Sequence, residues 1–183
     1  MKIYPEEIKA LNDAYQWHSF QKIKYTNEPY ICHPIAVCSL VKSIFTYEDL
    51  VCDSKSCLNM IQASLLHDVL EYTECPLSYL FNHYDSEVVQ LVISVNNISK
   101  PSDGSGVTRE KIDREYFSNA SQQAQTIKLA DLIHNTSSIV KYDVEFAKIY
   151  LEESLLLLPY LCDGNVVLFQ EAWNLLHSEY NKY

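Results

Sequence analysis

The chain has 183 residues, of which 48% are hydrophobic and 21% charged, a balance typical of one globular domain. Its only glycines are Gly104, Gly106 and Gly164, which cannot form G-x-G-x-x-G, a P-loop or a G-x-S-x-G elbow, so dinucleotide oxidoreductases, P-loop enzymes and α/β-hydrolases are disfavoured. The formal net charge of −10 argues against nucleic acid and anionic membrane surfaces as partners and leaves a small anionic substrate open.

The apolar residues in the first half of the chain recur at helical spacing. The first predicted helix begins at Pro5 and places Ile8, Leu11, Tyr15 and His18 on one face. A loop over residues 22–32 follows it. Four more helices are predicted in this half: one from about Pro34, one capped by Asp53 or Ser54 and ending near Tyr72, one over Pro76–Tyr84 and one over Ser86–Ile98.

The second half begins with a polar segment, PSDGSG (101–106), that is predicted to be a flexible linker. The helices predicted after it begin near Thr108 and cover Ser121–Val140, Val144–Leu161 and Asn165–Tyr180. We find no alternating strand pattern, repeat or domain break. The sequence therefore predicts an all-α fold, with residues 1–183 in a single domain of about eight or nine helices.

The expected cellular compartment is inferred from the targeting, membrane and cysteine patterns that the sequence does not show. Met1–Lys22 is amphipathic and charged, unlike a signal peptide, and no apolar run approaches the roughly 20 residues that span a bilayer. The six cysteines include no C-x-x-C pair, so a structural zinc site is not expected. We expect a soluble, cytoplasmic protein with reduced cysteines, and the sequence leaves its oligomeric state open.

One segment with residues that could carry chemistry is SLLHDVLEYTE (64–74). A charged Asp68 inside an apolar helical run is costly unless it is paired or bound to a metal ion. Adjacent helical residues diverge by about 100°, but the side chains of His67 and Asp68 are long enough to converge on one ion. Glu71 follows one turn later on the same face.

Two further segments carry candidate residues. In TIKLADLIHN (126–135), Asp131 interrupts apolar residues, with Asn135 one turn after it and Lys128 one turn before it. In PYICHP (29–34), His33 lies between a loop and a helix start. Each feature alone is weak evidence. A set of two histidines and two aspartates from three helices suits Mn²⁺ or Fe²⁺, with coordination sites left open for water and substrate.

This set and its order resemble the HD superfamily of metal-dependent phosphohydrolases. The closer resemblance is to the hydrolase domain of RelA/SpoT homologues and to small alarmone hydrolases of the metazoan SpoT-homologue type. It extends from about His18 to Asn135 and rests on H-x-x-Q (His18, Gln21), PYICHP, SLLHDVLEYTE and IKLADLIHN. The resemblance implies an HD-type helical domain that removes pyrophosphate from the 3′ position of a guanosine alarmone, (p)ppGpp, the nucleotide of the stringent response.

The resemblance also implies residue roles. Glu71 positions or activates the attacking water, and Asn135 lies near the ribose and phosphate as a catalytic and substrate-binding residue. The implied manganese ligands, which would also suit Fe²⁺ or another divalent ion, are His33, His67, Asp68 and Asp131. The implied substrate-binding lysines are Lys22 and Lys24, in a basic segment one residue longer than the usual pattern, with Lys100 and Lys128 as further phosphate candidates.

Tyr72 departs from the family pattern, because it stands where the family has its second catalytic carboxylate. A phenol with a reference pKa of about 10 cannot replace a carboxylate as a base at neutral pH. Three functions stay open. The chain is an active (p)ppGpp hydrolase in which Glu71 suffices, an HD phosphohydrolase for an adenosine alarmone or a nucleoside monophosphate, or a nucleotide sensor that has lost turnover.

Overall fold

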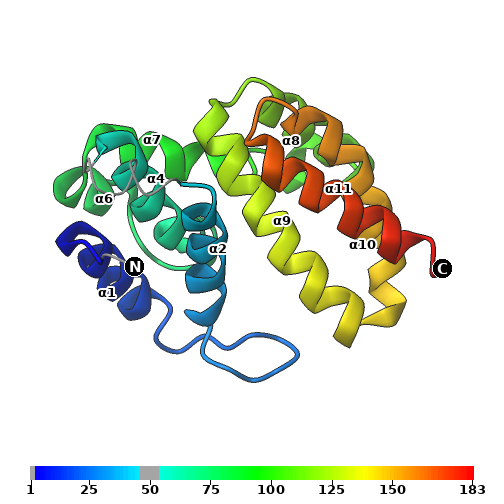
Figure 1. Ribbon diagram of the computed structural model, residues 1–183, viewed down its shortest axis with the longest axis horizontal. Helices are drawn as coiled ribbons and strands as arrows, with labels where there is room; N and C mark the ends of the chain where they lie inside the picture. Colours follow the sequence, from blue (N-terminus) through cyan, green and yellow to red (C-terminus); the bar gives the residue numbers. More distant parts are fainter. Residues whose placement is uncertain (1–2, 46–53) are drawn as a thin grey trace. The chain divides into compact units, whose positions relative to one another are not determined.

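The computed structural model describes residues 3–45 and 54–183, and it confirms the predicted all-α fold (Figure 1). Within these ranges the extended pairing is limited to one isolated bridge between Lys22 and Pro29. The chain forms two compact units, Met1–Asn96 and Asn97–Tyr183. That both belong to a single domain stays a prediction. Asp53, one of the two predicted helix caps, lies outside the described residues.

The first unit is organised around one buried helix. Every residue from Asn59 to Leu66 in α4 is buried, and α1, α2 and α7 pack against this helix. Such all-round burial requires neighbours on several faces of the helix. The helices of this unit are α1 (Pro5–Trp17), α2 (Cys32–Ser43), α4 (Lys55–Leu66), α5 (Val69–Tyr72), α6 (Leu77–His83) and α7 (Ser86–Val95).

The structure corrects the predicted buried face of α1. Ile8 and Tyr15 are 49% and 57% exposed, whereas Ala10 and Ala14 are fully buried. Of the predicted face, His18 at the end of the helix is the residue that is buried, at 2% exposure. Alanine side chains let two helix backbones approach closely, and α1 packs extensively against α4. The small residues, not the large ones, therefore mark the packing face.

The structure also corrects the predicted continuous helix that ends near Tyr72. The helix stops at Leu66, a turn follows at His67 and Asp68, and α5 begins at Val69. The Asp68 backbone, at φ −97° and ψ −7°, departs from regular helical values. The interruption therefore falls on His67 and Asp68, two of the predicted metal ligands.

The second unit is organised around α9 (Gln122–Tyr142), which packs against α10 and α11. The predicted linker at 101–106 contains a short 3-10 helix in which the Asp103 side chain accepts a hydrogen bond from the Lys100 backbone, so it is locally ordered. The other elements of this unit are η1 (Pro101–Asp103), α8 (Gly106–Ser118), α10 (Val144–Leu157), η2 (Leu158–Leu161) and α11 (Val166–Tyr180).

Two features of the described residues concern membrane-spanning helices and the state of the cysteines. In this part of the chain, no helix combines the length and the apolar character needed to cross a membrane. The five described cysteines are all free thiols, and burial raises the pKa of Cys38 and of Cys75 to about 11. That the cysteines are reduced in the cell stays a prediction.

Candidate active site

Three predicted metal ligands of the first unit lie together in a buried cluster. The two Nε2 atoms of His33 and His67 are 3.1 Å apart, and Asp68 Oδ2 is 3.2 Å from each of them. A triangle of this size matches one face of an octahedron whose centre lies about 2.2 Å from each corner. Two imidazoles and one carboxylate in this arrangement fit a divalent transition-metal ion and leave the opposite face for other ligands.

The break between α4 and α5 explains how adjacent residues converge on one point. In a regular helix the side chains of His67 and Asp68 would diverge by about 100°. The turn at these residues lets both side chains face His33, which stands in the first turn of α2. The prediction that His67 and Asp68 can serve one ion is thus supported by a local feature that helical periodicity did not predict.

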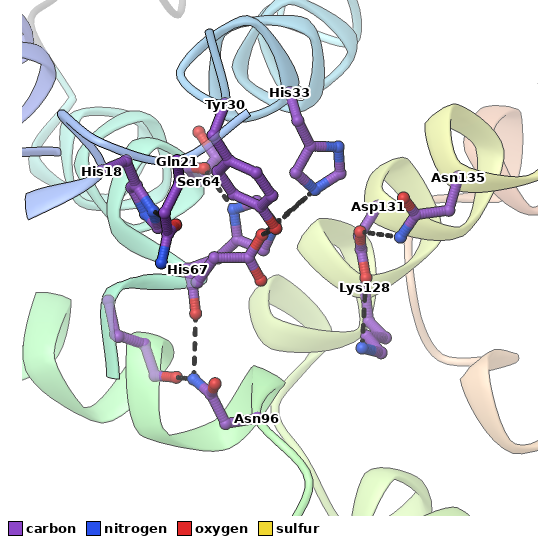
Figure 2. A network of polar contacts seen from close by, with 12 residues as sticks. His18, Gln21, Tyr30, His33, Ser64, His67, Asn96, Lys128, Asp131 and Asn135 are labelled. Carbon is purple, nitrogen blue, oxygen red and sulfur yellow. Dashed lines mark hydrogen bonds and ion pairs between the residues drawn. The ribbon is translucent and has the colours of Figure 1, made fainter. Parts of the chain in front are cut away.

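The ring of His67 is oriented by a backbone carbonyl, and the backbone of His67 is held by a side chain. Its Nδ1 lies 2.8 Å from the Ser64 carbonyl oxygen, which can only accept, so Nδ1 carries the proton and the Nε2 lone pair faces the cluster. The Asn96 side chain donates to the His67 carbonyl at 3.0 Å, as Figure 2 shows. A hydrogen bond from the ring nitrogen remote from the cluster, such as that from Nδ1 to the Ser64 carbonyl, is typical of metal-binding histidines.

Sequence reasoning missed Tyr30 as a functional residue. Its phenol donates a 2.7 Å hydrogen bond to Asp68 Oδ2. The ring stacks on His18 at 4.7 Å between centroids and meets the His33 ring edge-on at 5.7 Å. Tyr30 belongs to PYICHP, but a tyrosine in a loop gives no local sign of a partner 38 residues away.

His18 and Gln21 hold the loop between α1 and α2 against α5. His18 Nδ1 lies 2.6 Å from Gln21 Oε1, and the Gln21 amide donates to the Tyr72 carbonyl. Burial lowers the pKa of His18, with Gln21 and nearby Asp68 acting in the opposite direction. A neutral His18 is therefore favoured, and the loop is anchored to the backbone of α5.

Glu71, the predicted catalytic carboxylate, and Tyr72, at the position of the family's second catalytic carboxylate, lie on α5, directly after the cluster. The side chains of both are exposed, and that of Tyr72 is 51% accessible. The Tyr72 ring centroid lies 6.3 Å from that of Tyr30. An exposed carboxylate and an exposed phenol next to buried ligands can face a substrate, but a catalytic role for either residue stays a prediction.

The predicted substrate-binding lysines occupy different units. Lys22 and Lys24 lie on the loop between α1 and α2, where both are exposed and where Lys24 Nζ donates to the Tyr25 hydroxyl at 3.2 Å. Lys100 is an exposed residue of the second unit, at the start of η1. Phosphate binding by these lysines stays a prediction.

The remaining predicted residues form a cluster along α9 of the second unit. Asp131 is buried, and its two oxygens accept from Asn135 at 2.6 Å and from Lys128 at 3.1 Å (Figure 2). Lys128 also lies 5.2 Å from the centre of the Phe117 ring. Lys128 and Asn135 thus hold one carboxylate. The role of Asp131 as a fourth metal ligand stays a prediction.

The chain is similar to proteins that are named for guanosine nucleotides. The chain is 32% identical over 167 residues to a probable guanosine-3′,5′-bis(diphosphate) 3′-pyrophosphohydrolase of Mycoplasma pneumoniae, covering 84% of this chain and 21% of that protein. It is 32% identical over 139 residues to a GTP pyrophosphokinase of Streptomyces coelicolor, covering 73% and 15%. The chain therefore spans about a fifth or less of the length of these two relatives.

A shorter relative is matched over more of its length. The guanosine-3′,5′-bis(diphosphate) 3′-pyrophosphohydrolase MESH1 of Danio rerio is 32% identical over 130 residues, covering 70% of this chain and 66% of that protein. A solved structure, described as a metazoan ortholog of SpoT that hydrolyzes ppGpp, matches with a TM-score of 0.79 and 21% identity over 97% of both chains. That likeness establishes the fold.

The family assignment rests on a match through most of the chain. The model of the HD domain family matches residues 10–143, a range that includes all four predicted metal ligands. The buried His33–His67–Asp68 cluster supplies the histidine and aspartate pattern that the sequence predicted for such a domain. The chain belongs to the HD domain family.

Proposed function

We propose that the chain is a metal-dependent hydrolase that removes pyrophosphate from the 3′ position of (p)ppGpp, giving GDP or GTP. The observation that carries this proposal is the preorganised triangle of ligand atoms from His33, His67 and Asp68. Such a triangle leaves coordination positions for water and for a substrate phosphate. The relatives named as 3′-pyrophosphohydrolases support the choice of substrate.

The proposed cofactor is Mn²⁺, held by His33, His67 and Asp68, with Asp131 as the proposed fourth ligand. Imidazole and carboxylate ligands together suit Mn²⁺ and Fe²⁺, whereas the absence of thiolates from the cluster argues against a structural zinc site. When bound, a divalent ion polarises a phosphoryl oxygen and lowers the pKa of a coordinated water.

The chain's own residues carry the remaining steps of the proposal. Glu71 orients the attacking water toward phosphorus and takes its proton, because its carboxylate is the exposed acidic group that directly follows the cluster. The P–O bond to the nucleotide 3′-oxygen breaks, so this oxygen is the leaving group and takes up the proton that Glu71 received from water. The oxygen of the attacking water stays on the released pyrophosphate. Lys22, Lys24 and Lys100 are proposed to bind the anionic substrate.

Lys128 and Asn135 are proposed to hold the Asp131 carboxylate in place, because both donate hydrogen bonds to it. A lysine at 3.1 Å offsets part of the cost of burying the aspartate, and the amide restricts its rotation. Contact of either residue with the nucleotide is a further proposal. An Asp131 held in this way is preorganised, as a metal ligand requires.

Tyr72 supports a second candidate, an HD phosphohydrolase for an adenosine alarmone or a nucleoside monophosphate. Its half-exposed ring, whose backbone carbonyl is held by Gln21, offers an aromatic face in place of a carboxylate. Base stacking on this ring would alter which nucleotide is preferred. A nucleotide sensor without turnover is the third candidate, because Tyr72 cannot act as a carboxylate base.

One experiment separates these candidates. Release of phosphate and pyrophosphate is measured with Mn²⁺ from ppGpp, its adenosine counterpart and several nucleoside monophosphates, with Asp68→Ala as control. Metal-dependent pyrophosphate release from ppGpp, absent in the variant, supports the main proposal. Activity on the other nucleotides alone supports the second candidate, a hydrolase for a different substrate. Binding of Mn²⁺ and nucleotide without turnover favours the sensor. A cytoplasmic location and the absence of nucleic-acid partners stay predictions.

A further inference from the structure

We propose that Tyr30 is a positioning residue of the metal site, whose phenol holds Asp68 in the orientation that a divalent ion requires. The inference rests on the proposed metal-dependent function and goes one step beyond it. Tyr30 is not among the residues that sequence reasoning selected. The inference is supported by a direct contact of Tyr30 with a proposed metal ligand and by the contacts that restrain the Tyr30 ring.

The Tyr30 phenol contacts a proposed metal ligand directly. Tyr30 donates at 2.7 Å to Asp68 Oδ2, the oxygen that also lies 3.2 Å from the Nε2 atoms of His33 and His67. Rotation about the terminal bond of an aspartate is only broadly restricted by its own torsional preference. A hydrogen bond to a fixed donor selects one rotation. The phenol therefore keeps this oxygen at the corner of the ligand triangle.

The carboxylate that Tyr30 contacts, that of Asp68, is buried. The Asp68 side chain is 10% exposed, so few water molecules can satisfy its oxygens. A hydroxyl donating to a carboxylate forms a short, charge-assisted hydrogen bond, stronger than a neutral one. Loss of this donor would leave a buried acceptor with one partner fewer and permit rotations that turn Oδ2 away from the histidines.

Tyr30 is itself held in place by its neighbours. Its ring stacks on His18 with 29° between the ring planes, and its backbone N–H donates to the Gln21 carbonyl at 3.0 Å. His18 is buried and bonded to the Gln21 side chain, whose amide is in turn bonded to the Tyr72 carbonyl. Figure 2 shows His18, Gln21 and Tyr30 gathered beside His67. A donor restrained in this way is preorganised for its acceptor.

Loss of the Tyr30 phenol should weaken the binding of the metal ion. Partners that hydrogen-bond to metal ligands typically contribute 10–100-fold to metal affinity. Tyr30→Phe removes one oxygen and keeps the ring that stacks on His18. We therefore expect the Kd for Mn²⁺ to rise by about 10–100-fold while the helices of the metal-free protein stay folded.

A matched control exists in the same unit. Tyr84 also donates from a buried phenol to a carboxylate, Asp13 Oδ2, at 2.5 Å, but Asp13 is not a member of the ligand cluster. Tyr84→Phe thus removes the same hydrogen bond type from the same unit. Any general loss of stability is common to both variants, whereas a loss of metal affinity is specific to Tyr30.

The test measures free Mn²⁺ by electron paramagnetic resonance in titrations of the metal-free full chain, for the wild type and both variants. Thermal melting without metal compares their folding. The proposal expects weak Mn²⁺ binding by Tyr30→Phe alone, with metal-free melting temperatures of the two variants similar. Equal Mn²⁺ affinity of Tyr30→Phe and wild type, or equal losses in both variants, would overturn it. A wild type that binds no Mn²⁺ would overturn the metal site as well, which distinguishes the two failures.

Discussion

The ion pair between Lys42 and Glu7 joins the two helices that flank the loop carrying Tyr30. Lys42 Nζ lies 2.7 and 2.8 Å from the two Glu7 oxygens, and the side chains are 3% and 14% exposed. Lys42→Met keeps most of the buried stem and leaves the Glu7 carboxylate without its cation. Breaking a buried pair costs about 3–5 kcal/mol, and since water can still reach Glu7 we expect about 3 kcal/mol.

The loss can be measured in the first unit alone. The chain has two tryptophans, Trp17 in α1 and Trp173 in α11. In a Trp173→Phe background, Trp17 fluorescence during urea unfolding reports on the unit that contains the ion pair. The free energy of unfolding is then compared between proteins with and without Lys42→Met.

Two control variants make the reasoning refutable. Lys55→Met removes a pair with Asp85 whose side chains are 67% and 62% exposed, so it should change stability little. Adding Glu7→Leu to Lys42→Met removes the uncompensated charge and should recover most of the loss. A loss from Lys42→Met no larger than that from Lys55→Met, or no recovery in the double variant, would refute the argument.

Three further outcomes are expected. Mn²⁺ at 100 times its Kd should raise the free energy of unfolding by about 2.7 kcal/mol in the wild type and not in Asp68→Ala, and equal melting shifts would contradict the site. Burial lowers the pKa of His18, so the unfolded chain binds the proton first and stability falls as pH drops below about 6.5. His18→Gln should flatten this pH dependence of urea unfolding, and an unchanged slope speaks against it. Gly164→Ala places a Cβ 2.7 Å from Leu129 Cδ1 and should lower the free energy of unfolding in urea by about 1–3 kcal/mol. Gly106→Ala places its Cβ 3.8 Å from the nearest atom, Glu110 Oε1, and should be nearly neutral; equal effects would contradict the steric reason.

Helix existence was predictable because its signals are local. Ser121 caps α9 by accepting from the Ala124 backbone, and the predicted start of this helix was one residue away. Asn165 caps α11 in the same way, by accepting from Val167 and Leu168. A side chain that bonds to a backbone two or three residues later depends little on the rest of the fold. Such ends can therefore be read from the sequence.

The packing face of α1 was not predictable in this way. Large apolar side chains indicated one face, and the fold buried Ala10 and Ala14 instead. Which face is buried depends on the partner helix, and close contact with α4 favours small residues. The same limit applies to the end of α4, where helical spacing continued to Tyr72 but the helix stops at Leu66.

By itself, the sequence determined the all-α class, the HD family pattern and the identities of His33, His67 and Asp68 as candidate ligands. Only the tertiary structure decided how these ligands are oriented. The turn at 67–68 brings two adjacent side chains together, and the Tyr30 phenol and the Ser64 carbonyl hold them in place. The physical reason is that residue type and spacing encode which groups can bind a metal ion. Their orientation depends on hydrogen bonds between segments that meet only in the folded chain.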